Sequence, residues 1–238
     1  MLLFVVVVIF FATLTRSALG FGEALLSVPL LAMCMPVKVA VPLAALVSIT
    51  IAALVVAQDW RDIQVRSASW LVVSTLAGIP LGLWLLTTVA EALVKGLLAI
   101  IIIAFAAYCL RRRRPPALHD DKLAWCFGLG AGVLGGAYGM NGPPLVVYGT
   151  LRGWSPSQFR ATLQGYFLPA SLVGMAGYAL SGLWVPAVTH YYLLSLGPML
   201  LAVVLGRAIN RRLDTQRFTT TIHSALIAVG AILLLQAL

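Results

Sequence analysis

The chain has very little charge, and this scarcity excludes most soluble folds. Charged residues make up 10% of its 238 residues, against roughly 25% in soluble domains. Hydrophobic residues make up 61%, and the mean hydropathy is +1.01. Because a membrane-spanning helix needs about 20 apolar residues, this length leaves no room for a separate soluble domain. We therefore expect one all-α integral membrane domain over residues 1–238.

Cysteine and acidic residues are also scarce. The three cysteines, Cys34, Cys109 and Cys126, have no CxxC spacing and no histidine at metal-ligand spacing, so neither a disulfide framework nor a metal site is expected. The apolar runs contain no paired carboxylates and no Ser-His-Asp order, which argues against an intramembrane enzyme. The net charge of +9 comes from basic residues in loops between apolar runs. There, positive charge sets membrane orientation rather than binding nucleic acid.

Ten apolar runs are present, and four of them are short. The long runs are residues 37–57, 67–88, 92–110, 157–180, 185–206 and 218–238. The short runs, of 9 to 15 residues, are residues 2–14, 24–35, 123–137 and 143–151. At 1.5 Å per residue they cross only part of a bilayer core of roughly 30 Å. They form two pairs, each interrupted by a stretch that contains glycine, at residues 15–23 and 138–142.

The order of short and long runs is the same in the two halves of the chain. Matching landmarks are glycine at 20 and 139, proline at 36 and 156, and proline at 80 and 198, with spacings of 119, 120 and 118 residues. Half of the chain is 119 residues. This agreement predicts an internal duplication, with residues 1–114 as repeat one, 115–122 as a cytoplasmic linker and 123–238 as repeat two.

Basic residues distinguish two topologies for this duplication. If each short pair crossed the bilayer as one broken helix, seven basic residues would face one side and eight the other, against the positive-inside rule. If each pair is a re-entrant hairpin, over residues 2–35 and 123–151, thirteen lie on one side and only Lys38 and Lys95 on the other. We therefore predict two inverted repeats, each a re-entrant helical hairpin plus three transmembrane helices, with both termini outside the cytosol.

The two breaks are candidates for a binding site at the middle of the membrane. Backbone that leaves helical geometry inside a bilayer has to be buried in protein or line a polar cavity, and the free N–H groups of a helix start attract anions. In the second break Asn141 is a candidate N-cap, and Gly139, Gly142 and Pro143 fit a helix start. The alternative is that these glycines and prolines only let helices pack and kink.

In the first break Gly20 and Gly22 give a similar opening, and two charged residues lie beside it. A charge near the bilayer centre usually faces the bundle interior or a substrate path. Arg16 is a candidate counter-charge for an anionic substrate, since its planar fork suits oxyanions. The alternative is a structural ion pair between Arg16 and Glu23. Glu23 is also a candidate for coupling transport to protons, because a buried carboxyl can carry a proton.

Neutral polar residues near the middle of the first long helix of each repeat complete the set. Ser48, Thr50 and Gln164 either offer hydrogen bonds to a ligand or tie helices together. The expected substrate-binding residues are Arg16, Gly20, Gly22, Glu23, Ser48, Gly139, Asn141, Gly142, Pro143 and Gln164.

Two glycine-rich stretches have a distinctive order of residues. Residues 132–164 read GVLGGAYGMNGPPLVVYGTLRGWSPSQFRATLQ, and residues 20–48 read GFGEALLSVPLLAMCMPVKVAVPLAALVS. The first, with its spaced glycines, Gly-Pro-Pro and later Phe-Arg-Ala, resembles the second-repeat signature of the TauE/SafE sulfite-exporter family of bacterial membrane transporters. The second is similar to the matching element of repeat one, but has Glu23 and Ala24 where a glycine-rich run is usual. The resemblance implies export or uptake of small sulfur-containing anions such as sulfite or organosulfonates.

These observations predict a secondary active transporter of a small anion, with sulfite or an organosulfonate as substrate, in the bacterial cell membrane. It would work by alternating access around a midplane site formed by the two hairpin tips. The alternatives are a passive anion channel and a non-transporting membrane scaffold. The expected partners are the anionic substrate, membrane lipid and, as one option, coupled protons. No cofactor and no nucleic acid are expected, and the sequence leaves a homo-oligomer open.

Overall fold

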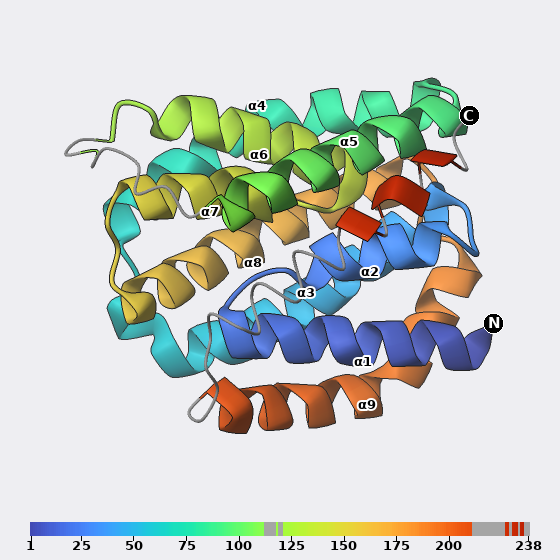
Figure 1. The fold of residues 1–238 in the computed structure, drawn as a ribbon, viewed down its shortest axis with the longest axis horizontal. Helices are drawn as coiled ribbons and strands as arrows, with labels where there is room; N and C mark the ends of the chain where they lie inside the picture. The colour runs from blue at the N-terminus through green and yellow to red at the C-terminus, as the bar shows by residue number, and fades with distance from the viewer. Residues whose placement is uncertain (112–117, 119–120, 211–226, 229, 233, 236–238) are drawn as a thin grey trace.

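The computed structural model describes residues 1–111, 118, 121–210, 227–228, 230–232 and 234–235. Within these residues the chain is helical and has no strand, which agrees with the predicted all-α class. The helices lie roughly side by side along one axis (Figure 1). The predicted helix 218–238 and most of the predicted linker 115–122 lie outside the described residues.

The described α-helices follow the predicted apolar runs in order. They are α1 (Leu2–Leu19), α2 (Glu23–Ala32), α3 (Val37–Asp59), α4 (Val65–Thr88), α5 (Glu91–Leu110), α6 (Ala124–Tyr138), α7 (Gly142–Leu151), α8 (Pro156–Leu180) and α9 (Pro186–Asn210), with a 3₁₀ turn η1 (Trp60–Asp62) after α3. In this part of the chain, five helices are long and apolar enough to cross a membrane: α1, α3, α4, α5 and α9. Helix α8 has 25 residues but is too polar to count among them. The described helices are those of a multi-pass membrane protein.

Helix α1 is longer than the apolar run that predicted it. The run ends at residue 14, but the helix continues to Leu19 because polar side chains there find partners inside the protein. Thr15 Oγ1 donates to Phe11 O at 2.9 Å, and Arg16 is only 3% exposed. Gly20 then ends the helix with a φ of 88°, a left-handed conformation that favours glycine. The break is therefore shorter than predicted, and the 18 residues of α1 are about 27 Å long rather than half a span.

Helices α1 and α2 run in opposite directions, and so do α6 and α7 (Figure 1). Val5, near the start of α1, belongs to the same apolar cluster as Leu31, near the end of α2. The rings of Phe127, near the start of α6, and Tyr148, near the end of α7, have centroids 5.5 Å apart. The first pair opens at the end of the bundle where α3 begins. The second pair opens at the opposite end, beside the start of α4.

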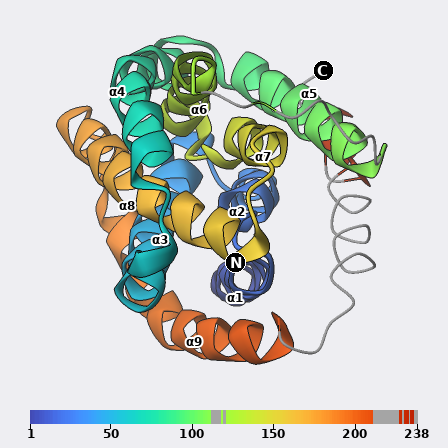
Figure 2. The same ribbon diagram turned by 90° about the vertical axis from the view of Figure 1, so that its left-hand side faces the viewer.

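The short helices α2 and α7 lie inside the bundle, enclosed by longer ones (Figure 2). The largest helix interfaces are α4 with α6, α1 with α9, and α3 with α8. Helices α4 and α6 approach so closely that a Cβ added at Gly78 or Gly82 would overlap the backbone carbonyls of Leu129 or Val133. Close backbone contact through small residues is typical of helix pairs in membranes.

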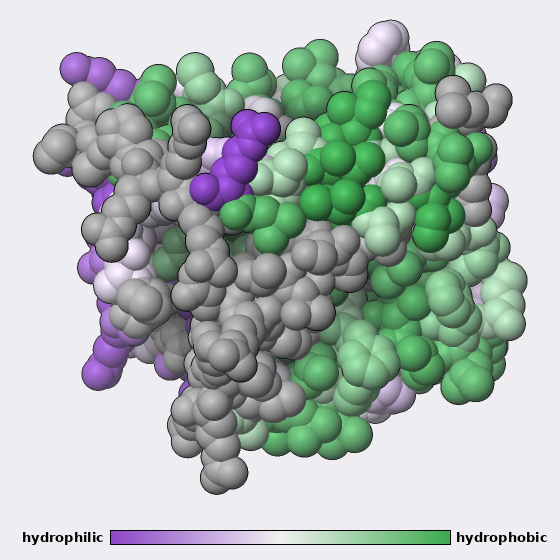
Figure 3. Space-filling view, viewed as in Figure 1, coloured by the Kyte–Doolittle hydropathy of each residue, from purple (hydrophilic) through white to green (hydrophobic). Residues whose placement is uncertain are grey.

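On the face drawn in Figure 3, apolar residues cover most of the right-hand part, and hydrophilic residues gather toward the left end. Leu81 and Leu97 are examples of exposed apolar side chains on α4 and α5. Arg61, Arg66 and Lys122 are exposed at the end of the bundle where the second helix pair opens. An apolar surface with basic residues at one end fits a protein surrounded by lipid.

Asp121 joins the second helix pair to α4 at that same end. Its Oδ1 accepts hydrogen bonds from Ser67 Oγ at 2.8 Å and from the Tyr148 hydroxyl at 2.6 Å. Arg152 Nε and Arg66 Nε lie 3.5 and 3.9 Å from its carboxylate oxygens. Burial acts to raise the pKa of Asp121, but the hydrogen bonds and positive charges outweigh it and lower that pKa below its ordinary value. The ionised carboxylate therefore stabilises the contact between α4 and α7.

We expect Asp121→Asn to lower the free energy of unfolding by about 1–2 kcal/mol, because the amide loses charge-assisted hydrogen bonds. A carboxyl whose pKa is lowered by folding stabilises the fold above its unfolded pKa, and that contribution is lost as pH falls through the folded pKa. Melting temperatures of the two proteins in detergent should thus differ at neutral pH and converge below about pH 4. Equal melting temperatures at neutral pH would contradict this role.

Candidate functional site

Both breaks reach one small cavity in the middle of the molecule. Eight of the predicted site residues line it: Arg16, Gly22, Glu23, Ser48, Gly139, Asn141, Gly142 and Pro143. The other two, Gly20 and Gln164, adjoin it through hydrogen bonds described below. The cavity volume is about 20 Å³, which is room for about one water molecule. The cavity is therefore small in this structure.

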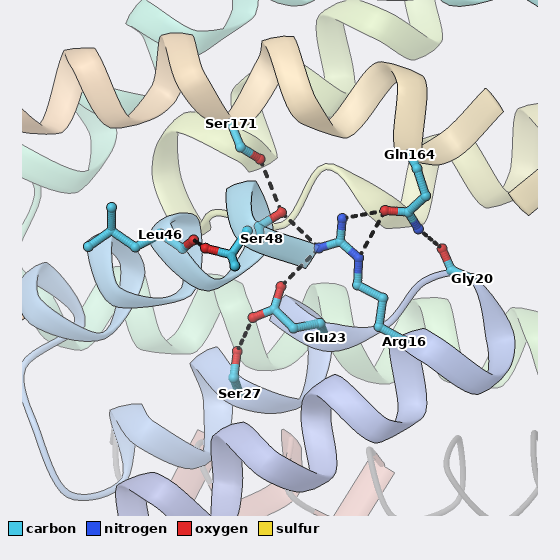
Figure 4. A network of polar contacts seen from close by, with 9 residues as sticks. Arg16, Gly20, Glu23, Ser27, Leu46, Ser48, Gln164 and Ser171 are labelled. Atoms are coloured by element: carbon cyan, nitrogen blue, oxygen red, sulfur yellow. Dashed lines mark hydrogen bonds and ion pairs between the residues drawn. The ribbon is translucent and has the colours of Figure 1, made fainter. Parts of the chain in front are cut away.

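Arg16 is the centre of a buried hydrogen-bond network (Figure 4). Its Nε and Nη2 both donate to Gln164 Oε1, at 3.2 and 2.6 Å. Its Nη1 donates to Ser48 Oγ at 2.8 Å and to Glu23 Oε2 at 3.2 Å. The guanidinium carbon also lies 4.8 Å from the centroid of the Phe167 ring, a cation–π distance. Side chains from α2, α3 and α8 thus converge on one cation carried by α1.

Gln164 ties this cation to the first break. Its Oε1 accepts from Arg16, while its Nε2 donates to Gly20 O at 2.6 Å. Gln164 is 1% exposed, so both ends of its amide are satisfied within the protein. The contact holds the carbonyl at the end of α1 against α8.

Arg16 and Glu23 form an ion pair in this structure, at 3.2 Å with side chains 3% and 1% exposed. Of the two interpretations of Arg16, the structure thus shows the ion pair. Glu23 Oε1 also accepts from Ser27 Oγ at 3.1 Å. Ser48 Oγ lies 3.1 Å from Ser171 Oγ and, because it accepts from Arg16, is free to donate to it. The hydroxyl groups of Ser27 and Ser48, which contact the pair, add no charge to it.

The start of α2 presents free backbone N–H groups to the cavity. The first backbone hydrogen bond of this helix runs from Leu26 N to Gly22 O at 3.1 Å. The N–H groups of Glu23, Ala24 and Leu25 therefore have no carbonyl four residues back, as at any helix start. All three residues line the cavity. Together with the positive end of the helix dipole, they favour a negative group there.

The second break offers fewer donors, and Asn141 does not act as predicted. Asn141 holds the N-cap position of α7, but its side chain makes no capping hydrogen bond. An N-cap side chain accepts from the second or third helical N–H, and here those positions are Pro143 and Pro144, which have none. Only Gly142 among the first three residues of α7 carries an N–H.

Asn141 belongs instead to a neutral network around Tyr166 of α8. Asn141 Nδ2 donates to the Tyr166 hydroxyl at 3.3 Å, which lies 2.5 Å from Thr75 Oγ1. Thr75 in turn donates to Gly128 O at 2.8 Å. This network fixes the second break against α4 and α8 without placing a charge beside the cavity.

Sequence reasoning missed the apolar lining and left the role of Thr50 open. Phe21, Met140 and Phe167 line the cavity. The duplication points to Phe167, because it lies 119 residues after Ser48 and so holds the equivalent position in repeat two. Thr50 does not line the cavity. Its hydroxyl donates to Leu46 O and lies 2.7 Å from the Tyr192 hydroxyl of α9, so Thr50 ties helices together.

A buried charge network and free helix-start N–H groups at the centre of a helical membrane protein are features found along the solute paths of membrane transporters. The chain belongs to the TauE/SafE sulfite exporter family, whose model matches residues 5–233. This match covers nearly the whole chain and confirms the resemblance found in its sequence. No curated protein and no solved structure matches the chain. Because the family is one of transporters, its membership supports transport rather than catalysis.

Proposed function

We propose that the protein is a secondary transporter of a small anion, sulfite or an organosulfonate, which binds in the cavity between the two breaks. The observation that carries this proposal is Arg16, a cation 3% exposed beside the unbonded N–H groups of α2. Both features favour negative charge at the same place. Membership of a sulfite exporter family supports a sulfur oxyanion as that charge.

The helix contacts support a two-fold relation between the halves. Exchanging the halves turns α1 into α6 and α4 into α9, so the α4–α6 interface becomes the α9–α1 interface and α3–α8 maps onto itself. These are the three largest interfaces. We therefore place α1–α2 and α6–α7 as re-entrant hairpins that enter the bacterial cell membrane from outside and from the cytosol, with both termini outside. A reporter fused after Leu238 tests this topology, and a cytosolic reporter would contradict it.

The small size of the cavity supports alternating access. With a volume of about 20 Å³, it holds about one water and is too small for a sulfonate. Binding therefore requires the two tips to separate, and separation toward one side at a time gives a carrier rather than an open channel.

Proteoliposomes containing the purified protein test this function directly. We expect uptake of sulfite and methanesulfonate that saturates with concentration and is accelerated by unlabelled anion on the opposite side, since a carrier exchanges its substrate. Flux without such exchange would favour a passive channel. The absence of any anion flux would favour a membrane scaffold and contradict the proposal.

Filling the cavity with one methyl group tests its position. A Cβ added at Gly142 meets nothing within 4 Å, and Gly142 lines the cavity. Gly142→Ala should therefore lower methanesulfonate flux by about tenfold or more, because its methyl group takes space the anion needs. Alanine at position 142 would directly precede Pro143, and the helical conformation is disfavoured before proline. The variant can therefore fold less well, so flux is normalised to the amount of folded protein.

The matched control is Gly197→Ala on α9. An added Cβ there also meets nothing within 4 Å, and Gly197 does not line the cavity. We expect wild-type flux from this variant. Equal flux from both variants would place the binding site elsewhere.

A further inference from the structure

We infer that the cavity binds a monovalent anion and a proton together. Glu23 takes the proton, and the Arg16 N–H that was donated to Glu23 is donated to the anion instead. The inference rests on the proposed transport function and specifies the charge and the coupling of its substrate. Arg16 Nη1 lies 3.2 Å from Glu23 Oε2, and both residues line the cavity. A solute bound there therefore meets both charges.

The cavity holds no other charge among the described residues that line it. Arg16 and Glu23 are the charged members of that lining. Helices α3 and α8 contribute Ser48 and Phe167, and the start of α7 contributes neutral groups. The nearby phenol of Tyr166 is engaged with α4 and with the second break.

Charged groups on the other helices packed against this region are engaged elsewhere. On α5, Lys95 pairs with Glu91 at 3.3 Å in the first turns of that helix. Lys38, at the start of α3, donates to a backbone carbonyl at the end of α4. Arg160 of α8 lies against Gly20 and does not line the cavity. The charge of the cavity is therefore set by the Arg16–Glu23 pair.

Counting charges gives the stoichiometry. The empty pair has charge +1 − 1 = 0. A monoanion added beside an ionised Glu23 would bring the site to −1 and put two negative charges together where the dielectric screening is weak. A proton from water, bound to a Glu23 oxygen, returns the total to zero. The Arg16 N–H that was donated to Glu23 is then donated to the anion.

Ser27 can accommodate both states of Glu23. Its hydroxyl donates to Glu23 Oε1 at 3.1 Å in the ion-paired state. A hydroxyl can also accept, so it can turn to accept from the O–H of a protonated Glu23. A dianion such as sulfate would leave the site at −1 even with this proton. The site therefore selects monoanions, such as sulfonates and hydrogen sulfite.

The second repeat has no counterpart of this pair. Across the spacing of 119 residues, Arg16 corresponds to Gly135 and Glu23 to Gly142. Since the duplication supplies a single proton-binding carboxylate to the shared cavity, one proton accompanies one anion.

The experiment measures proton movement with anion movement in proteoliposomes that contain a pH-sensitive dye. Methanesulfonate stays a monoanion and sulfate a dianion from about pH 5 to about pH 8. We expect an inward methanesulfonate gradient to carry protons inward at about one per anion, and sulfate to carry neither. Sulfate flux equal to that of methanesulfonate, or methanesulfonate flux without protons, would overturn the inference.

Glu23→Gln should uncouple the two movements. We expect it to lose proton movement, and whatever exchange of labelled for unlabelled methanesulfonate remains should lose its dependence on pH. Ser27→Ala provides a second variant that keeps the ion pair. In this variant the ionised Glu23 loses a hydrogen-bond donor, so it takes up a proton more readily. The flux of the variant should therefore persist to a pH higher by about one unit than that of the wild type. Proton coupling retained by Glu23→Gln, or an unchanged pH profile in Ser27→Ala, would overturn the role of Glu23.

The two levels of proposal fail differently. If the wild type moves neither sulfite nor methanesulfonate, the transport function fails and the coupling fails with it. If it moves sulfite but not methanesulfonate, or moves anions without protons, the coupling of a monovalent sulfonate fails while the transport function stands.

Discussion

Replacing Arg16 with glutamine should reduce methanesulfonate flux and binding by about a hundredfold or more. Truncating one member of a buried, hydrogen-bonded charge pair typically costs about 2–5 kcal/mol of binding, and each 1.4 kcal/mol is about a factor of ten. Arg16 supplies the four hydrogen bonds that join α2, α3 and α8 at the cavity. Radiolabelled uptake and a thermal-shift titration of the purified protein measure the two losses.

The control for this variant has to separate lost binding from lost folding. Arg16→Gln alone leaves Glu23 buried without its cation, which is destabilising in itself. The double variant Arg16→Gln, Glu23→Gln removes both charges and should recover most of the melting temperature without recovering flux. Near-wild-type flux from either folded variant would contradict the role assigned to Arg16.

Gly82→Ala should strongly destabilise the protein, although it adds only one methyl group. Its Cβ would overlap Val133 O and lie 2.6 Å from Ala137 N. These are backbone atoms of α6, so no side chain can rotate away to make room. We expect a loss of at least about 3 kcal/mol, seen as a fall in melting temperature of roughly 10 °C and a poor yield of monodisperse protein.

Gly197→Ala again gives the comparison, since it makes the same substitution within a helix where an added Cβ meets nothing. Alanine favours helix over glycine, so this variant should melt at or slightly above the wild-type temperature. A Gly82→Ala protein as stable as Gly197→Ala would show that α4 and α6 can move apart without penalty.

The positions of the breaks could be predicted from sequence because glycine marks them. Gly20 and Gly139 adopt φ of 88° and 64°, a conformation other residues rarely adopt. The predicted end of α1 was wrong because a rule based on apolar residues stops at the first polar one. Arg16 stays helical since its partners, such as Gln164, lie 148 residues away, and no local pattern reports a contact of that range.

The members of the site were easier to predict than their roles. Arg16 and Glu23 stood out because charge is rare in such a sequence, but only the structure distinguishes the ion pair from two separate groups. The capping role of Asn141 was wrong for a reason already present in the sequence, since Pro143 and Pro144 carry no N–H. Phe167 was missed because an aromatic residue in an apolar helix looks like ordinary core.

Helix α8 shows how a helix that contributes to the site can fall below a hydropathy threshold for membrane-spanning segments. The polar side chains that it brings to the network around Arg16 and Ser48, Gln164 and Ser171 among them, lower its mean hydropathy, although it has 25 residues. In the proposed topology α8 crosses the membrane, but a count of crossings based on apolar windows omits it. Accessibility labels placed in residues 152–155 and 181–185, on either side of α8, would correct that count.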